Sequence, residues 1–319
     1  MSKIVAIQRK QPVFYVFWHL TDFCNWKCSY CPDHLHSGDY AMGRKDGYPT
    51  DDEINRFIDL VIENLHGRKL WLTLSGGEPT VHPMFSTIIK RLKPYGVIGI
   101  NSNGSRPLKW WKSLEELPSG CTFSLHNEYV DKLPQLNELC HYLADNNVDL
   151  QFNLVCDPSY WDRVVKMYDM IDQRFNNYII CWPVHDKAPI RNRHVSNYSE
   201  EQQAWMKRHQ ALFLKQNSIF NPYLSLATFD DGKSIPLKLF SETKLKLEGL
   251  NRFNGWSCDV GIDSINVNYD GQVWTSICKY QRLGRLDNFK LLEQSGTCSF
   301  EICIHPADLA VNKRAPDRT

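Results

Sequence analysis

The stretch Thr21-Asp22-Phe23-Cys24-Asn25-Trp26-Lys27-Cys28-Ser29-Tyr30-Cys31-Pro32 carries three cysteines at C-x3-C-x2-C spacing. It follows the apolar run at residues 13–20 (VFYVFWHL), which predicts a strand. Three thiolates on one loop can bind three irons of a 4Fe–4S cluster and leave the fourth iron open for a small molecule. Half of a zinc site is an alternative, although zinc pairs usually come as matched C-x2-C repeats. A disulfide knot is disfavoured by the odd count of 11 cysteines and by the lack of a secretory signal.

The composition is that of a globular protein from a reducing compartment. The 319 residues leave room for one large domain and a small one. A formal net charge of +1 gives no global basic field for nucleic acid. No apolar run approaches the ~20 residues of a membrane span. We therefore expect a cytoplasmic protein with no membrane partner.

Strand and helix signals alternate over the first two thirds of the chain. Strands are expected at residues 13–20, 70–74, 97–100, 122–125, 150–155 and 178–182, and helices at residues 51–65, 83–92, 132–145, 160–173 and 199–216. Thr50 is the expected N-cap of the first helix. The alternation predicts an α/β fold with a parallel sheet and outer helices, in a curved or partial barrel. We expect this barrel at residues 1–216, a bridging segment at residues 217–254 and a C-terminal module at residues 255–319.

Polar and glycine-rich stretches follow several of these strands. Leu74-Ser75-Gly76-Gly77-Glu78-Pro79 stands at the carboxyl end of the second strand, where α/β folds bind ligands. The glycines allow close backbone approach, and Glu78 can accept a charge-assisted hydrogen bond from an ammonium group. A plain Gly-Gly turn is the alternative. Asn153 is expected to face the same cavity, with Phe152 and Leu154 pointing away by strand alternation.

A second group of cysteines follows residue 255. Asp270-Gly271 predicts a tight hairpin turn that brings Cys278 back toward Cys258. Another hairpin is expected at residues 225–234, with its turn at Asp231-Gly232. Together with Cys298 and Cys303, the first two thiols can form a four-cysteine cluster site, with His305 as a possible substitute ligand. Structural zinc is the alternative for this site.

Cys24, Cys28 and Cys31, with the aromatic Tyr30 before the last cysteine, resemble the motif of the radical S-adenosylmethionine (radical SAM) enzymes. The resemblance implies a partial (β/α)6 TIM-like barrel in which the open iron binds the amino and carboxylate groups of SAM. It also implies a methionine-binding role for Gly76, Gly77 and Glu78. Asn103 matches the family's Asn-Gly contact to the cofactor. Ser124 matches a ribose-binding serine, although capping of the sheet edge is an equal alternative.

The C-terminal cysteines resemble the auxiliary-cluster extension of the same family. The long form, called SPASM, carries about seven cysteines, whereas Cys258, Cys278, Cys298 and Cys303 fit the shorter, one-cluster twitch form. The resemblance therefore implies a small α/β twitch-like domain with an auxiliary 4Fe–4S cluster. Four available cysteines favour full ligation and hence a role in electron transfer.

By this resemblance, a reduced cluster cleaves SAM to methionine and a 5′-deoxyadenosyl radical, which abstracts a hydrogen atom from the substrate. We expect oxidation or rearrangement of a sugar or nucleotide derivative, with a flavodoxin- or ferredoxin-type reductant. The alternatives are a peptide (RiPP) maturase, an RNA-modifying enzyme and a non-catalytic metal-binding protein. Because the first expected strand begins at residue 13, we expect no leader-peptide-binding domain before it, although a separate partner protein could supply that function.

Four cysteines remain. Cys121 and Cys140 are expected in the core, whereas Cys156 and Cys181, near strand ends, are candidate hydrogen-atom donors or plain core thiols. Several loop residues are expected to face the cavity: His34, His36, Asp39, His126, His185, Asp186, Arg191, Arg193 and Tyr198.

Overall fold

The computed structural model describes residues 3–31, 48–184, 197–209, 225–237, 245, 249–303 and 305–316. Its larger sheet, within these residues, has nine strands in the order β13-β12-β11-β2-β3-β4-β5-β6-β7. The strands are β2 (Val13–Thr21), β3 (Lys69–Gly76), β4 (Gly96–Ser102), β5 (Gly120–Leu125), β6 (Asp149–Cys156), β7 (Ile179–Pro183), β11 (Ser264–Val267), β12 (Gln272–Trp274) and β13 (Arg282–Arg285). Strands β2 to β7 run parallel, and β11 continues the parallel arrangement beside β2.

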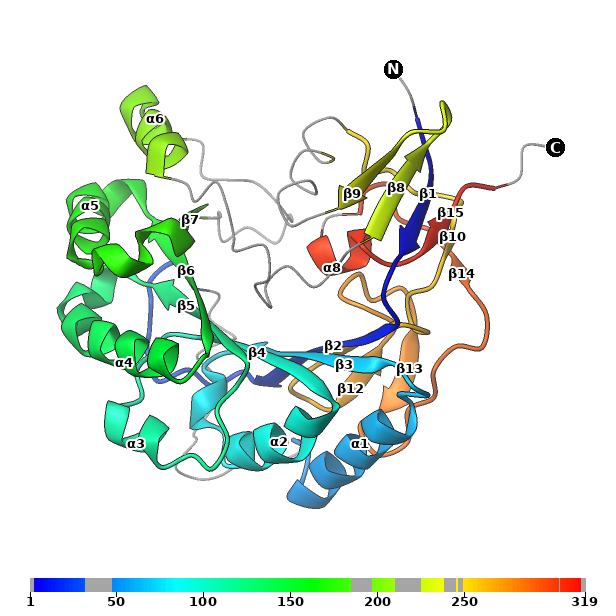
Figure 1. The fold of residues 1–319 in the computed structure, drawn as a ribbon, viewed down its shortest axis with the longest axis horizontal. Helices are drawn as coiled ribbons and strands as arrows, with labels where there is room; N and C mark the ends of the chain where they lie inside the picture. Colours follow the sequence, from blue (N-terminus) through cyan, green and yellow to red (C-terminus); the bar gives the residue numbers. More distant parts are fainter. Residues whose placement is uncertain are drawn as a thin grey trace.

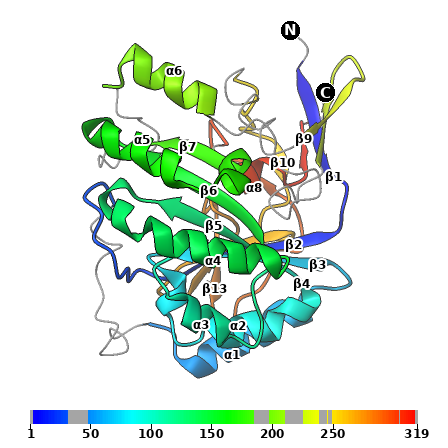
Figure 2. The same ribbon diagram turned by 60° about the vertical axis from the view of Figure 1, so that its left-hand side comes forward.

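Helices cover the outer face of this curved sheet (Figures 1 and 2). They are α1 (Asp51–Glu63), α2 (Phe85–Leu92), α3 (Leu108–Lys112), α4 (Leu133–Asp145), α5 (Trp161–Met170) and α6 (Glu200–His209). The main hydrophobic core lies between the two layers; the ring of Trp18 on β2, for example, lies 4.7 Å from that of Phe57 on α1. Thr50 caps α1 in a capping box with Glu53, as expected from the sequence.

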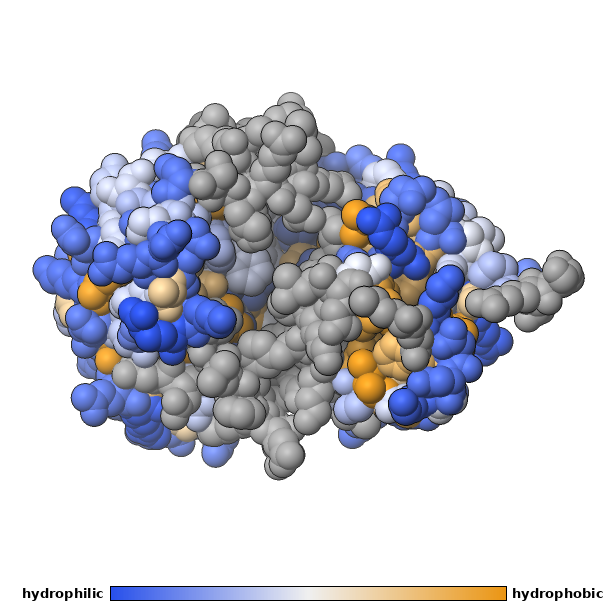
Figure 3. All heavy atoms as spheres, turned by 90° about the horizontal axis from the view of Figure 1, so that it is seen from above, coloured by the Kyte–Doolittle hydropathy of each residue, from blue (hydrophilic) through white to orange (hydrophobic). Residues whose placement is uncertain are grey.

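A second sheet lies beside the open edge of the barrel, with strand order β14-β10-β15-β1-β8-β9. Its strands are β1 (Ile4–Arg9), β8 (Ser225–Phe229), β9 (Ser234–Leu237), β10 (Ser257–Cys258), β14 (Gly296–Thr297) and β15 (Lys313–Arg314). Both ends of the chain lie at this sheet, and the short helix α8 (Pro306–Leu309) lies close by (Figure 1). From above, the molecule is hollowed between the helical side and the second sheet (Figure 3).

The predicted parallel sheet with outer helices is confirmed, and all six expected barrel strands are present within one or two residues of their predicted bounds. Both hairpins are present as well, because β8 pairs with β9 and β11 with β12. The expected end of the last helix at residue 216 lies outside the described residues. The first and third predicted segments contribute strands to both sheets, and the bridging segment contributes β8 and β9 to the second, so the boundaries stay a prediction. Among the described helices, none has the length and apolar content needed to cross a bilayer.

Candidate cluster and cofactor site

The cysteine loop leaves the carboxyl end of β2 and places Cys24, Cys28 and Cys31 together. Cys28 is 5% exposed, and the Cys24 and Cys31 side chains are half-buried. Burial raises the pKa of the Cys24 thiol to about 11 and that of Cys28 to about 12, and the neighbouring thiols add to both shifts. The free thiols are therefore protonated at neutral pH, and binding iron would displace protons. Three mutually close thiols on one loop fit three irons of a 4Fe–4S cluster.

The Gly76-Gly77 turn after β3 supports this loop through its backbone. Gly77 N donates to the Thr21 carbonyl and Glu78 N to the Phe23 carbonyl, each at 2.8 Å. A Cβ on Gly76 would lie 2.1 Å from Thr21 O, and one on Gly77 would lie 2.0 Å from Phe23 O. Only glycine allows the loop to approach this closely. The two glycines thus fix the position of the cysteine loop on the sheet edge.

The Glu78 side chain is fully buried and holds the next strand end rather than facing the cavity. Its Oε1 accepts from Thr80 N at 3.1 Å, from Thr80 Oγ1 at 2.6 Å and from Ser102 Oγ at 2.9 Å, and its Oε2 accepts from Asn103 N at 2.6 Å. Burial outweighs these bonds and raises the pKa of Glu78 above its usual range. Both oxygens are engaged inside the protein, Oε2 by a single donor, and the expectation that this carboxylate also accepts from an ammonium group stays a prediction.

Asn103, at the end of β4, lies against the cysteine loop. Its amide nitrogen donates to Asn25 Oδ1 at 3.0 Å and lies 3.6 Å from Cys24 Sγ. Its Oδ1 accepts from Ser105 N at 2.9 Å. Asn103 therefore helps to position the Cys24 thiol. This puts Asn103 beside the cysteine loop, where its contact with the cofactor was expected.

The segment after β5 holds the other side of the cysteine loop. Ser29 N donates to Glu128 Oε1 at 2.9 Å, and Lys27 N donates to the Tyr129 hydroxyl at 3.0 Å. The Trp26 and Tyr129 rings stack with centroids 4.1 Å apart. His126 Nδ1 lies 2.5 Å from the Tyr30 hydroxyl, and burial lowers the pKa of His126 to about 4. The sequence alone did not indicate that Glu128 and Tyr129 hold the loop, because loop-to-loop contacts leave no periodic signal.

The inner face of the sheet is polar where the strands approach their carboxyl ends. Ser124 of β5 and Asn153 of β6 are register partners, so their side chains lie side by side. Within the described part of the chain, Asn153 Oδ1 is buried without a hydrogen-bond partner, which fits a missing donor from a bound molecule. Thr122 and Gln151, also register partners, extend the polar face by one step. Strand alternation from Ser124 and Asn153 could have identified both.

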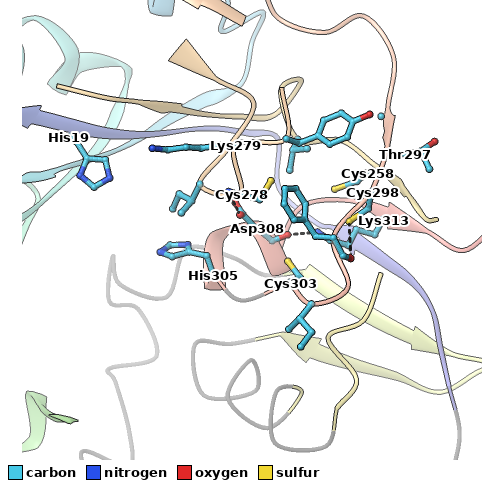
Figure 4. A pocket seen from close by; sticks show the side chains of 16 residues that line it. His19, Cys258, Cys278, Lys279, Thr297, Cys298, Cys303, His305, Asp308 and Lys313 are labelled. Carbon is cyan, nitrogen blue, oxygen red and sulfur yellow. Dashed lines mark hydrogen bonds between the residues drawn. The ribbon is translucent and has the colours of Figure 1, made fainter. Parts of the chain in front are cut away.

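The four C-terminal cysteines line one cavity of about 430 Å³ (Figure 4). Cys258 lies on β10. Cys278 lies on the loop after β12, Cys298 on the loop after β14, and Cys303 on the loop before α8. Burial raises the pKa values of Cys278 and Cys298, and raises that of Cys303 to about 12. Four thiols facing a single space fit a fully ligated 4Fe–4S cluster.

The same cavity connects the cysteines to the inner face of the barrel. His19, Lys279 and His305 lie on one side of it, opposite Cys258 and Cys298 (Figure 4). His19 belongs to β2, and Phe17, two residues before it, lies 5.8 Å from the His305 ring. The cavity also holds the buried pair Asp308 and Lys313.

No three His, Cys, Asp or Glu side chains converge on a single ion-binding point in the described parts of the chain. A cluster does not need such convergence, because each thiolate binds its own iron.

Cys156 and Cys181 lie in the core on the outer side of the sheet. Cys156 is fully buried and shares a face with Phe152 and Leu154, which pack toward the helices as expected, whereas Asn153 faces inward. Cys181 pairs with Leu154 and lies near Tyr168 of α5. This placement favours packing over hydrogen-atom donation. Cys121 and Cys140 are fully buried core thiols, as expected.

Two of the expected cavity residues can be placed. His126 contacts the cysteine loop, and Tyr198 accepts from Val184 N at 2.9 Å and donates to the Cys156 carbonyl. The others lie outside the described residues: His34, His36, Asp39, His185, Asp186, Arg191 and Arg193.

Comparison with known proteins identifies relatives for the barrel. The family model described as "Radical SAM superfamily" matches residues 18–141. A stretch of 97 residues is 35% identical to the probable GTP 3′,8-cyclase of Thermococcus kodakarensis, covering 30% of this chain and 29% of that protein. The chain thus matches less than a third of this relative's length.

Solved structures resemble a larger part of the chain. Native anSMEcpe with bound AdoMet aligns with a TM-score of 0.54 at 16% identity, covering 87% of this chain and 79% of that chain. The same protein with AdoMet and the Cp18Cys peptide gives 0.53 at 15% identity, covering 87% and 78%. At these identities the likeness shows the fold.

Proposed function

We propose that this chain, whose residues 18–141 match the radical SAM superfamily model, is a radical SAM enzyme that cleaves SAM reductively and abstracts a hydrogen atom from a sugar or nucleotide derivative. A four-iron cluster held by Cys24, Cys28 and Cys31 would supply the electron that breaks SAM into methionine and a 5′-deoxyadenosyl radical. The observation that carries the proposal is the cysteine loop itself. Its three thiols lie together and are fixed by the Gly76-Gly77 turn.

The polar inner face supports binding of SAM and of a polar substrate next to this loop. Ser124 and Asn153 offer a hydroxyl and an unpartnered buried amide oxygen at the carboxyl ends of β5 and β6. Hydroxyl groups of a ribose or sugar can donate to such an oxygen. The name of the Thermococcus relative, a probable GTP 3′,8-cyclase, agrees with a nucleotide substrate.

We further propose that Cys258, Cys278, Cys298 and Cys303 hold an auxiliary 4Fe–4S cluster. In an oxidation, the substrate would lose a hydrogen atom to the adenosyl radical, then an electron to this cluster and a proton to solvent. The His19 side of the cavity supports this role, because it brings the four thiols next to the inner face of the barrel. A flavodoxin- or ferredoxin-type protein would supply the first electron.

Anaerobic reconstitution tests both sites. We expect about eight irons in the wild type and about four in a Cys24→Ala/Cys28→Ala/Cys31→Ala variant, with 5′-deoxyadenosine formed from SAM and dithionite in the wild type only. A Cys140→Ala variant, which removes a core thiol outside both sites, should keep eight irons and SAM cleavage. Zinc in place of iron, or no cleavage by the fully loaded protein, would refute the catalytic proposal.

The substrate class is tested by stimulation of 5′-deoxyadenosine formation. Nucleoside triphosphates and phosphorylated sugars, each deuterated at candidate carbons, should stimulate cleavage and transfer deuterium to 5′-deoxyadenosine. A cysteine-containing peptide serves as the comparison, since a structure of the same fold holds one. Deuterium transfer from the peptide alone would refute the small-molecule assignment and favour a maturase.

A further inference from the structure

Lys313 is an almost fully buried lysine at the C-terminal cysteine cavity. It is 2% exposed and pairs directly with Cys258 across β10 and β15. Directly opposed side chains of antiparallel strands lie about 4.5–5.5 Å apart at Cβ. The lysine therefore faces the same cavity as the four thiols, as Figure 4 shows.

Among the residues that the structure describes, the hydrogen bonds of the Lys313 ammonium group go to carbonyl oxygens and to no carboxylate. Nζ donates to the carbonyl oxygens of Asp308 and Val311 and lies 5.4 Å from the centroid of the Phe253 ring. Carbonyl groups solvate an ammonium group but do not neutralise it. A buried charge of this kind is costly unless an opposite charge lies close to it.

Asp308 supplies negative charge at the same cavity, next to Lys313, whose Nζ donates to the Asp308 carbonyl oxygen. It is 2% exposed, and its carboxylate accepts from Ser276 Oγ and from Cys278 N, the latter at 2.8 Å. The backbone N–H of Cys278 is thus bonded to the Asp308 carboxylate, while Cys258 pairs with Lys313. The cavity that the four cysteines line therefore holds two neighbouring buried side chains of opposite charge.

We propose that Lys313 is a positioning charge that stabilises the reduced form of the auxiliary cluster, and that Asp308 opposes it. The inference rests on the auxiliary cluster proposed above. A four-cysteine cluster is anionic and gains one more negative charge on reduction, so a buried cation beside it favours the reduced form. Since Lys313 and Asp308 are themselves only 2% exposed, their interaction with a cluster beside them is weakly screened. The pair would set how readily the cluster accepts an electron from a substrate radical.

Redox titration of the isolated auxiliary cluster tests the inference. The Cys24→Ala/Cys28→Ala/Cys31→Ala background removes the other cluster, so iron content and the electron paramagnetic resonance signal report on this site alone. Lys313→Met and Lys313→Gln remove the cation, Asp308→Asn removes the opposing charge, and Lys233→Met removes an exposed lysine from the β8–β9 turn as the matched control.

We expect both Lys313 variants to weaken reduction of the cluster at least tenfold, a shift of about 59 mV to more negative potential for one electron. Asp308→Asn should shift the potential in the opposite direction, and Lys233→Met should leave it unchanged. If Lys313→Met fails to hold iron, Lys313→Gln and Asp308→Asn decide the sign.

Unchanged potentials, or shifts of the same sign in the Lys313 and Asp308 variants, would show that Lys313 only binds the carbonyl groups near α8 and would overturn the inference. An iron-free triple-cysteine background is a different result. It would refute the auxiliary cluster itself, and the inference with it.

Discussion

Replacing Glu78 with glutamine separates a structural role of this side chain from a ligand role. Two backbone N–H groups, from Thr80 and Asn103, point at different oxygens of the carboxylate. A glutamine side chain has one oxygen, so its NH2 group must face one of these two donors. That donor loses its acceptor inside a fully buried site.

The structure allows the size of the effect to be worked out. A lost hydrogen bond costs about 1 kcal/mol, and a buried donor left unpaired costs about 1–3 kcal/mol more. We therefore expect Glu78→Gln to lower the free energy of unfolding by about 3 kcal/mol. The measurement is urea unfolding of the reduced, iron-free protein, followed by circular dichroism, so that no cofactor contributes.

A matched control comes from Thr80, whose hydroxyl donates to the same carboxylate. Thr80→Val keeps the shape and the backbone donor, so we expect a loss of only about 1 kcal/mol. The reasoning is refuted if Glu78→Gln unfolds like the wild type while the reconstituted variant binds SAM more weakly. That pair of results would make Glu78 a ligand of the cofactor.

Further substitutions test the loop, the buried imidazole and the link to the C-terminal region. Gly77→Ala places a Cβ 2.0 Å from a carbonyl oxygen of the cysteine loop; it should cost about 1–3 kcal/mol and lower iron binding in the reconstituted protein. Burial lowers the pKa of His126 to about 4, so the unfolded chain binds a proton first as pH falls from about 6.5. The wild type should therefore lose about 3 kcal/mol more than His126→Gln between pH 7 and pH 4, and parallel urea curves would contradict this. Arg68 donates to Asp263 at 2.8 Å in a partly buried ion pair; Arg68→Ala should cost about 2–3 kcal/mol, against less than about 0.5 kcal/mol for the exposed Arg56→Ala.

The elements that the sequence predicts well are those with a local signal. The run at residues 13–20, the Thr50 cap and the Asp270-Gly271 turn each combine side-chain chemistry with short-range geometry. Strand β1 was missed because Ile4–Arg9 is short and partly polar. It is stabilised by pairing with β8 and β15, which lie more than 200 residues away in the chain.

The residues of the candidate site also divide into those that a local sequence signal predicts and those that it does not. The spacing of the cysteine motif indicated three thiols on one loop, and the hairpin turn brought Cys278 to the same cavity as Cys258. The sequence did not show that Glu78 is enclosed, because its donors come from a neighbouring strand end. Nor did it single out Lys313, since a lysine in a short polar stretch normally lies on the surface.

The pairing of β1 with β15 also orders the events of folding. Arg9 N donates to Asn312 Oδ1 across 303 positions of the chain, and Ile7 is opposite Lys313. Contacts between such distant segments form late, because a long loop must close first. Until β15 pairs with β1, the strand that carries Lys313 does not line the cavity, and the C-terminal thiols stay open to solvent and oxidants. Iron delivery to this cavity would therefore follow chain closure, and a growing or truncated chain would expose oxidisable cysteines instead of a protected site.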